Sequence, residues 1–122
     1  MRKRVLIVEN EVDTQDTLQS ILEMANCDVE VASDGLVALE KLGGTLKPDL
    51  IFLDLMMPRM DGYTFVQELR GREICTSVPI VVISGDSQIR QMVKKMGMDV
   101  FISKPFEIDE VLDIVNALVE PQ

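Results

Sequence analysis

The chain has 122 residues, 47% of them hydrophobic, and its 21 acidic and 12 basic residues give a formal net charge of −9. This length and apolar content suffice for one domain with a real core and leave no room for a second folded domain. The negative charge argues against direct binding to nucleic acid or to an anionic membrane surface. No apolar run approaches the roughly 18 to 20 residues of a membrane span, and the N-terminus lacks a cleavable signal pattern. We therefore expect a cytoplasmic protein with one domain over residues 1–122.

Apolar runs and stretches with helical periodicity alternate along the chain. Short runs of Val, Ile, Leu and Phe indicate strands, and apolar residues that recur every three or four positions indicate helices. In chain order, we expect a strand at Val5–Val8, a helix around 18–25, a strand at Val29–Ala32, a helix around 36–42, a strand at Leu50–Leu53, a helix around 65–69, a strand at Ile80–Ile83, a helix around 89–96, a strand at Val100–Ile102 and a helix around 108–118.

This alternation is typical of a parallel sheet that is covered on both faces by right-handed crossover helices. The runs at Val5–Val8, Leu50–Leu53 and Ile80–Ile83 are the most uniformly apolar, as strands in the middle of such a sheet are. The stretch DVEVA at 28–32 alternates in polarity, as an edge strand does. The sequence therefore predicts an α/β protein of the flavodoxin-like class, a doubly wound (βα)5 sheet with strand order 2-1-3-4-5.

Polar residues stand at the carboxyl ends of the predicted strands. Glu9 and Asn10 follow the first strand, Asp54 ends the third, Ser84 ends the fourth and Lys104 lies just past the fifth. Because the carboxyl ends of parallel strands share one edge of the sheet, these side chains should converge on one crevice. Convergence would also explain why Asp54 stands directly after four apolar residues. A carboxylate at such a position is costly to bury without a partner, and the converging side chains would supply one.

These residue types suit an incoming phosphoryl group. Carboxylate and amide oxygens are the ligands that a small hard cation such as Mg²⁺ takes, with water completing its shell. The cation and the Lys104 ammonium would neutralise the phosphoryl oxygens, and the Ser84 hydroxyl would bind one of them. A carboxylate can then attack as an aspartyl nucleophile. We expect Asp54 to be this nucleophile, because it ends the central strand, where the other groups can surround it.

Four motifs carry a resemblance to a known family. They are VLIVENE at the first strand, LIFLDLMMPRMDG around Asp54, VVISG at the fourth strand and FISKPF at the fifth. With these motifs at these spacings, the sequence resembles response-regulator receiver domains of two-component signalling over essentially its whole length. The resemblance implies a receiver domain that acts as a phosphoacceptor and not as an enzyme, and from the length of the chain we expect no output domain in it. It also implies a sensor histidine kinase or a phosphotransfer protein as the partner that donates a phosphoryl group to Asp54.

The resemblance further implies a Mg²⁺ site, in which one residue departs from the family's pattern. Mg²⁺ would be held by Glu9, by the side chain of Asn10, by Asp54 and by the Met56 carbonyl. The family usually has two adjacent acids after the first strand, and the second is here Asn10, which brings an oxygen but no charge. Mg²⁺ binding should therefore be weaker. Glu11 either compensates through water or begins the first helix as a solvated acid, and we favour the second interpretation.

The remaining roles concern the phosphoryl group and the response to it. The resemblance implies that Ser84 and Lys104 contact the phosphoryl group, and that a cis peptide between Lys104 and Pro105 aims the ammonium inward. Phe101 stands at the family's aromatic switch position, where it would turn inward when Ser84 moves toward phosphate. A downstream protein would then bind the face made by the fourth helix, fifth strand and fifth helix, on a monomer or a weak homodimer.

Three functions remain open at the level of sequence. The leading one is a phosphoacceptor switch that signals through protein contacts or a phosphorelay. The second is a phosphate-independent, receiver-like interaction module, which Asn10 favours and which the otherwise complete set of Asp54, Ser84 and Lys104 disfavours. The third is a haloacid-dehalogenase-like phosphatase, which expects a second Asp two residues after its nucleophile, where this chain has Met56. Since the sequence contains no His, a partner kinase or a small phosphodonor must supply the phosphoryl group.

Overall fold

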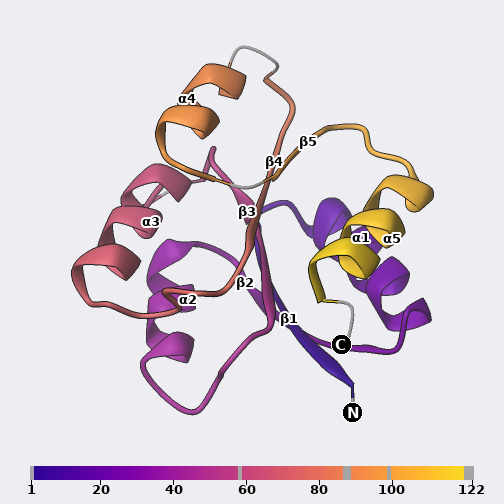
Figure 1. Cartoon of the computed structure of the whole chain (residues 1–122), viewed down its shortest axis with the longest axis horizontal. Helices are drawn as coiled ribbons and strands as arrows, with labels where there is room; N and C mark the ends of the chain where they lie inside the picture. The colour runs from indigo at the N-terminus through magenta and orange to yellow at the C-terminus, as the bar shows by residue number, and fades with distance from the viewer. Residues whose placement is uncertain (1, 58, 87–88, 99, 120–122) are drawn as a thin grey trace.

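Five parallel strands form one sheet in the order β2-β1-β3-β4-β5, which confirms the flavodoxin-like order predicted from the sequence. The structure is a computed structural model that describes residues 2–57, 59–86, 89–98 and 100–119 (Figure 1). Its strands and helices alternate along the chain as β1 (Lys3–Val8), α1 (Val12–Met24), β2 (Cys27–Ala32), α2 (Gly35–Leu42), β3 (Leu50–Asp54), α3 (Gly62–Gly71), β4 (Ile80–Ser84), α4 (Arg90–Lys95), β5 (Val100–Ser103) and α5 (Ile108–Val119).

The sheet is covered on both faces, with α1 and α5 on one side and α2, α3 and α4 on the other (Figure 1). Successive strand residues point to opposite faces. In β1, Val5 and Ile7 belong to the core with α1 and α5, whereas Leu6 and Val8 belong to the core with α2, α3 and α4. Burial on both faces explains why the central strands read as unbroken apolar runs. No helix in the described part of the chain is long and apolar enough to cross a membrane.

Two strands, β1 and β2, are longer than the apolar runs in the sequence indicate. Both β1 and β2 begin two residues earlier than predicted, because Lys3 pairs with Cys27 and Arg4 pairs with Asp28 in parallel register. This pairing uses the backbone, so it does not depend on apolar side chains. At the other end of the sheet, α4 has only 6 residues. It ends just before Gly97, whose φ of 72° is a conformation that glycine adopts readily.

Gly62 brings the loop after β3 back against the end of that strand. A Cβ at Gly62 would lie 2.7 Å from the Leu55 Cα and 2.8 Å from the Asp54 carbonyl oxygen, so this close approach requires glycine. The Gly62 N–H donates a hydrogen bond to the Leu55 carbonyl at 3.1 Å. Asp61 caps α3 by accepting a hydrogen bond from the Thr64 N–H at 2.7 Å. The loop that begins at Leu55 is thereby anchored beside Asp54.

Candidate functional site

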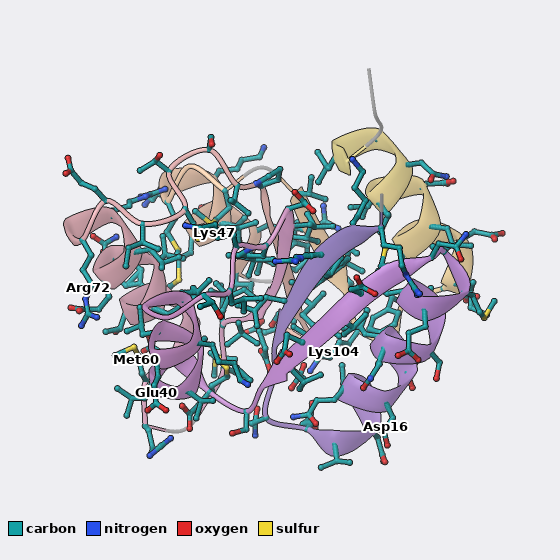
Figure 2. All side chains as sticks on the ribbon, turned by 90° about the horizontal axis from the view of Figure 1, so that it is seen from below. Asp16, Glu40, Lys47, Met60, Arg72 and Lys104 are labelled. Atoms are coloured by element: carbon teal, nitrogen blue, oxygen red, sulfur yellow. The ribbon has the colours of Figure 1, made fainter. Side chains whose placement is uncertain are left out.

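A cleft of about 490 Å³ opens at the carboxyl ends of β1, β3, β4 and β5. In Figure 2, Asp16 and Arg72 lie at the periphery of the molecule, whereas Lys104 lies beside the strands. The structure therefore brings the polar residues at the strand ends together, as the sequence analysis expected. The cleft is lined by Asn10, Glu11, Asp54, Met56, Ser84, Gly85, Asp86 and Lys104.

Asp54 is the last residue of β3 and is only 3% exposed. Its Oδ1 accepts a hydrogen bond from the Met56 N–H at 2.9 Å, and its Oδ2 lies 3.5 Å from the Lys104 Nζ. The carboxylate thus has a backbone donor on one oxygen and a cation near the other. These two partners offset the cost of placing a charge at the end of a buried strand.

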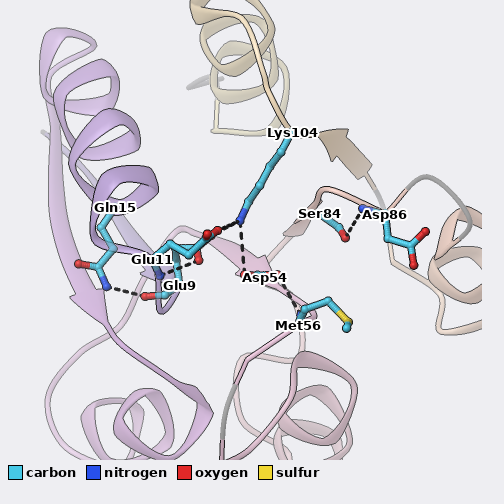
Figure 3. Close-up of polar contacts among 8 residues, drawn as sticks. All are labelled: Glu9, Glu11, Gln15, Asp54, Met56, Ser84, Asp86 and Lys104. Carbon is cyan, nitrogen blue, oxygen red and sulfur yellow. Dashed lines mark hydrogen bonds and ion pairs between the residues drawn. The ribbon is translucent and has the colours of Figure 1, made fainter.

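The Lys104 ammonium lies among three carboxylates (Figure 3). Its Nζ is 2.7 Å from Glu11 Oε1, 2.9 Å from Glu9 Oε1 and 3.5 Å from Asp54 Oδ2. Burial alone would lower the pKa of Lys104, but the hydrogen bond to Glu11, the close contact with Glu9 and the charge of Asp54 outweigh this effect and raise it. The peptide between Lys104 and Pro105 is cis, which confirms the expectation from the family resemblance. Lys104 therefore carries a fixed positive charge in the cleft.

Glu9 is fully buried at the end of β1. Its Oε2 accepts a hydrogen bond from the Glu11 N–H at 3.0 Å. Its Oε1 makes no hydrogen bond within the described residues, because Lys104, although close, does not approach it with hydrogen-bond geometry. Burial raises the pKa of Glu9, and the neighbouring Asp54 carboxylate adds to the rise, while the Glu11 N–H and Lys104 act against it.

The acidic residues of the cleft fit a small hard cation. Carboxylate oxygens of Glu9, Glu11 and Asp54 lie within 4.8 Å of one another. A buried carboxylate oxygen without a hydrogen bond, as in Glu9, is a ready ligand for such an ion. The donor set consists of oxygen atoms, which is the chemistry that Mg²⁺ prefers.

The other expected metal ligands also lie in the cleft. Asn10 is exposed and is one of the residues that line the cleft. The Met56 backbone is tied to Asp54, whereas its side chain is 66% exposed and points away from Lys104 (Figure 3). The roles of the Asn10 side chain and the Met56 carbonyl as ligands stay predictions.

Ser84 and Phe101 lie in the neighbouring strands β4 and β5. Ser84 is 1% exposed at the end of β4, and its Oγ accepts a hydrogen bond from the Asp86 N–H at 3.1 Å. Phe101 is half-buried in β5 and packs against the core on the side of α2, α3 and α4. The guanidinium of Arg90, from α4, lies over the Phe101 ring.

Glu11 is the site residue whose part the sequence reasoning underestimated. As predicted, it precedes α1 and is exposed, with 60% of its side chain accessible. However, its carboxylate also binds Lys104, and this contact lowers the pKa of Glu11. Its position directly after Glu9 and Asn10 was the available signal, because a second acid close to the same strand end can reach the same edge of the sheet.

A family model described as the response regulator receiver domain matches residues 5–116. The chain belongs to this family. RpaA of Synechocystis, described as a DNA-binding dual master transcriptional regulator, is 37% identical over 118 residues, which cover 95% of this chain and 48% of RpaA. Protein PilG of Pseudomonas aeruginosa is 31% identical over 118 residues, which cover 95% of this chain and 87% of PilG. The receiver domain thus spans about half the length of RpaA and most of PilG.

Solved structures agree with this assignment. The chemotaxis protein CheY4 of Vibrio cholerae superposes with a TM-score of 0.87 at 27% identity, over 97% of this chain and 99% of that protein. Receiver domains are phosphoacceptor switches of two-component signalling that interact with histidine kinases and downstream targets. The predicted family, fold class and general function are confirmed at this level.

Proposed function

We propose that this receiver domain is switched by a phosphoryl group transferred to Asp54 from a phosphohistidine of a sensor kinase or phosphotransfer protein. The observation that carries this proposal is the setting of Asp54, whose Oδ1 is held by the Met56 N–H while its Oδ2 faces Lys104. Oδ2 attacks phosphorus, and the bond between phosphorus and the imidazole nitrogen of the donor breaks. The imidazole keeps the electron pair and takes up a proton, and Asp54 becomes an acyl phosphate.

The acidic cluster would hold Mg²⁺, through Glu9, Asp54, the Asn10 side chain and the Met56 carbonyl. Mg²⁺ bound there supplies positive charge that neutralises phosphoryl oxygens. The chain's own contribution is to fix the carboxylates before the donor arrives, since Glu9 and Asp54 are buried and each accepts a backbone hydrogen bond. Such preorganisation lowers the barrier because little rearrangement is needed during transfer.

Lys104 and Ser84 would bind the new phosphoryl group. The Lys104 ammonium is already 3.5 Å from Asp54 Oδ2, so a short movement brings it to a phosphoryl oxygen. Ser84 now accepts a hydrogen bond from the Asp86 N–H, and its hydroxyl hydrogen can be donated toward the phosphoryl group. Both residues would act as donors to the dianionic phosphoryl group, which stabilises the acyl phosphate.

The signal would leave through the face made by α4, β5 and α5. Movement of Ser84 toward phosphate would let Phe101 turn inward, which changes this face by shifting a pre-existing equilibrium. A downstream protein would bind the changed face of a monomer or a weak homodimer. The domain would act as an acceptor that assists its own phosphorylation and slow self-dephosphorylation, without turning over a separate substrate.

A phosphate-independent interaction module is the second candidate, and Asn10 is the observation that favours it. Intact-mass analysis after treatment with acetyl phosphate and Mg²⁺ separates the two functions. The switch predicts one added phosphoryl group on the parent protein and none on Asp54→Asn. The absence of an adduct at every Mg²⁺ concentration would favour the interaction module.

A further inference from the structure

We propose that Glu11 is a carboxylate of the cation site and supplies the negative charge that Asn10 cannot. This inference rests on the proposed function, because it concerns the cation that would assist transfer to Asp54. Glu11 lies one residue beyond the position where the family usually carries its second acid. Its carboxylate nevertheless lies in the same cluster as those of Glu9 and Asp54, within 4.8 Å.

The Lys104 ammonium shows where the cluster attracts positive charge. It contacts Glu11 and Glu9 more closely than Asp54, at 2.7, 2.9 and 3.5 Å. With all three acids ionised, three negative charges face one positive charge, which leaves an excess of two. A divalent cation matches this excess, and its arrival would free Lys104 to contact a phosphoryl group.

A second, independent observation points to a missing ligand at this place. Glu9 Oε1 is fully buried and has no hydrogen bond within the described residues. Such an oxygen is costly to leave without a hydrogen bond, and the Lys104 ammonium 2.9 Å away offsets this cost through its charge alone. A cation held between Glu9 and the other two carboxylates would remove this cost.

Glu11 has a fixed backbone, and its side chain is not used to cap the helix. Its N–H donates to Glu9 Oε2 at 3.0 Å, and its carbonyl accepts a hydrogen bond from the Gln15 N–H at 3.0 Å. At the N-terminal boundary of α1 its side chain makes no capping hydrogen bond, unlike those of Asp34 and Asp61 at α2 and α3. The Glu11 carboxylate is therefore available to the cleft instead of being used to cap the helix.

If Glu11 only interacted favourably with the dipole of α1, it would behave like any other acid in the first turn of this helix. Such an effect is shared by acids of the first turn and falls off along the helix. Asp13, which is exposed in the first turn of α1, provides the matched control because it carries the same charge outside the cluster. Glu11→Gln and Asp13→Asn remove the same charge from the same end of the same helix.

The test is a double-mutant cycle in cation affinity, measured by calorimetry with Mg²⁺ and by the electron paramagnetic resonance signal of free Mn²⁺. Glu11→Gln should weaken binding roughly tenfold in the parent, since it removes one of the nearby charges. In the Asn10→Asp background, where a carboxylate stands at the usual position, the loss should fall to about threefold or less. Asp13→Asn should bind like the parent.

Two results would overturn the inference. One is an equal effect of Glu11→Gln and Asp13→Asn, and the other is an equal loss from Glu11→Gln in the Asn10 and Asn10→Asp backgrounds. Either result leaves the proposed function untouched as long as Asp54 accepts phosphate. Failure of the proposed function would instead appear as the absence of a phosphoryl adduct in intact-mass analysis, whatever the cation affinities are.

Discussion

The guanidinium of Arg90 lies over the ring of Phe101, with Arg90 Cζ 5.1 Å from the ring centroid. This cation–π contact joins α4 to β5 and holds the aromatic side chain at the proposed switch position in its present place. A contact of this kind on the surface contributes about 0.5 to 1 kcal/mol, which corresponds to a few-fold change in a conformational equilibrium.

Removal of this contact should loosen the proposed switch without phosphate. In Arg90→Ala, the conformation in which Phe101 turns inward should be more populated, because the contact that opposes it is lost. Amide hydrogen exchange in α4 and β5 should therefore increase by roughly two- to fivefold. Lys94→Ala removes a charge of the same sign from the same helix and serves as the control. Equal exchange in the two variants would show that Arg90 does not restrain Phe101.

Met56 should make the phosphorylated form long-lived. Its side chain is exposed two residues after Asp54 and cannot orient an attacking water by hydrogen bonding, as an amide or a carboxylate can. Met56→Asn should therefore speed the loss of phosphate several-fold, below the roughly 10²-fold that general acid–base assistance supplies where it operates fully. The decay of the phosphorylated mass species measures this rate, with the exposed and remote Met24→Asn as control. An unchanged decay rate would mean that Met56 does not stand near the path of water.

The ion pair between Asp34 and Arg59 should make stability depend on pH. Burial alone would raise the pKa of Asp34, but the Val37 N–H and Arg59 outweigh it and hold the pKa below its ordinary value of 3.8. A carboxyl whose pKa is depressed in the folded state contributes stability above its unfolded pKa and loses it as pH falls through the folded value.

Asp34→Asn should therefore lower the free energy of unfolding by about 1 kcal/mol at pH 7, because Asn keeps the helix cap but loses the charge attraction to the half-exposed Arg59. The difference from the parent should shrink as pH falls below about 4. Urea unfolding at pH 7 and at pH 3 measures it. A difference that does not change with pH would show that the ion pair contributes nothing.

Much of the fold and the gathering of the site could be predicted from the sequence. Uniform apolar runs at β1, β3 and β4 indicated central parallel strands, and parallel geometry then placed Asp54, Ser84 and Lys104 at one edge. These predictions succeeded because strand period and crossover handedness restrict the topology before any side-chain contact is considered.

Two side-chain contacts of the cleft and its surroundings could not be predicted from strand order and periodicity. Lys104 binds Glu11 across 93 positions of sequence separation, and Arg90 stacks on Phe101 between a helix and a strand. Each contact depends on the conformations of long side chains, which periodicity does not encode. The sequence therefore predicted the residues of the cleft and the exposed position of Glu11 before α1, but not the contact between Glu11 and Lys104.

In the absence of a cation, the protein with Asn10 should be more stable than a variant with an acid at this position. Asn10→Asp adds a carboxylate beside Glu9, Glu11 and Asp54, and like charges a few ångströms apart repel by about 1 kcal/mol per pair even in water-like surroundings. The variant should unfold at lower urea concentration in the presence of chelator. Asn116→Asp adds the same charge on an exposed position of α5 and controls for net charge. Equal midpoints for the two variants would mean that the acids of the cleft are too well solvated to repel.

Asp54 itself should become the acyl phosphate. Borohydride reduces an aspartyl phosphate to homoserine, so peptide mass mapping after phosphorylation and reduction identifies the residue that carried the phosphate. We predict homoserine at position 54 in the parent, at lower yield in Lys104→Ala because the ammonium near Asp54 Oδ2 is lost, and none in Asp54→Asn. Homoserine at another acidic position, or an unmodified Asp54 in a sample that had gained a phosphoryl group, would contradict the account.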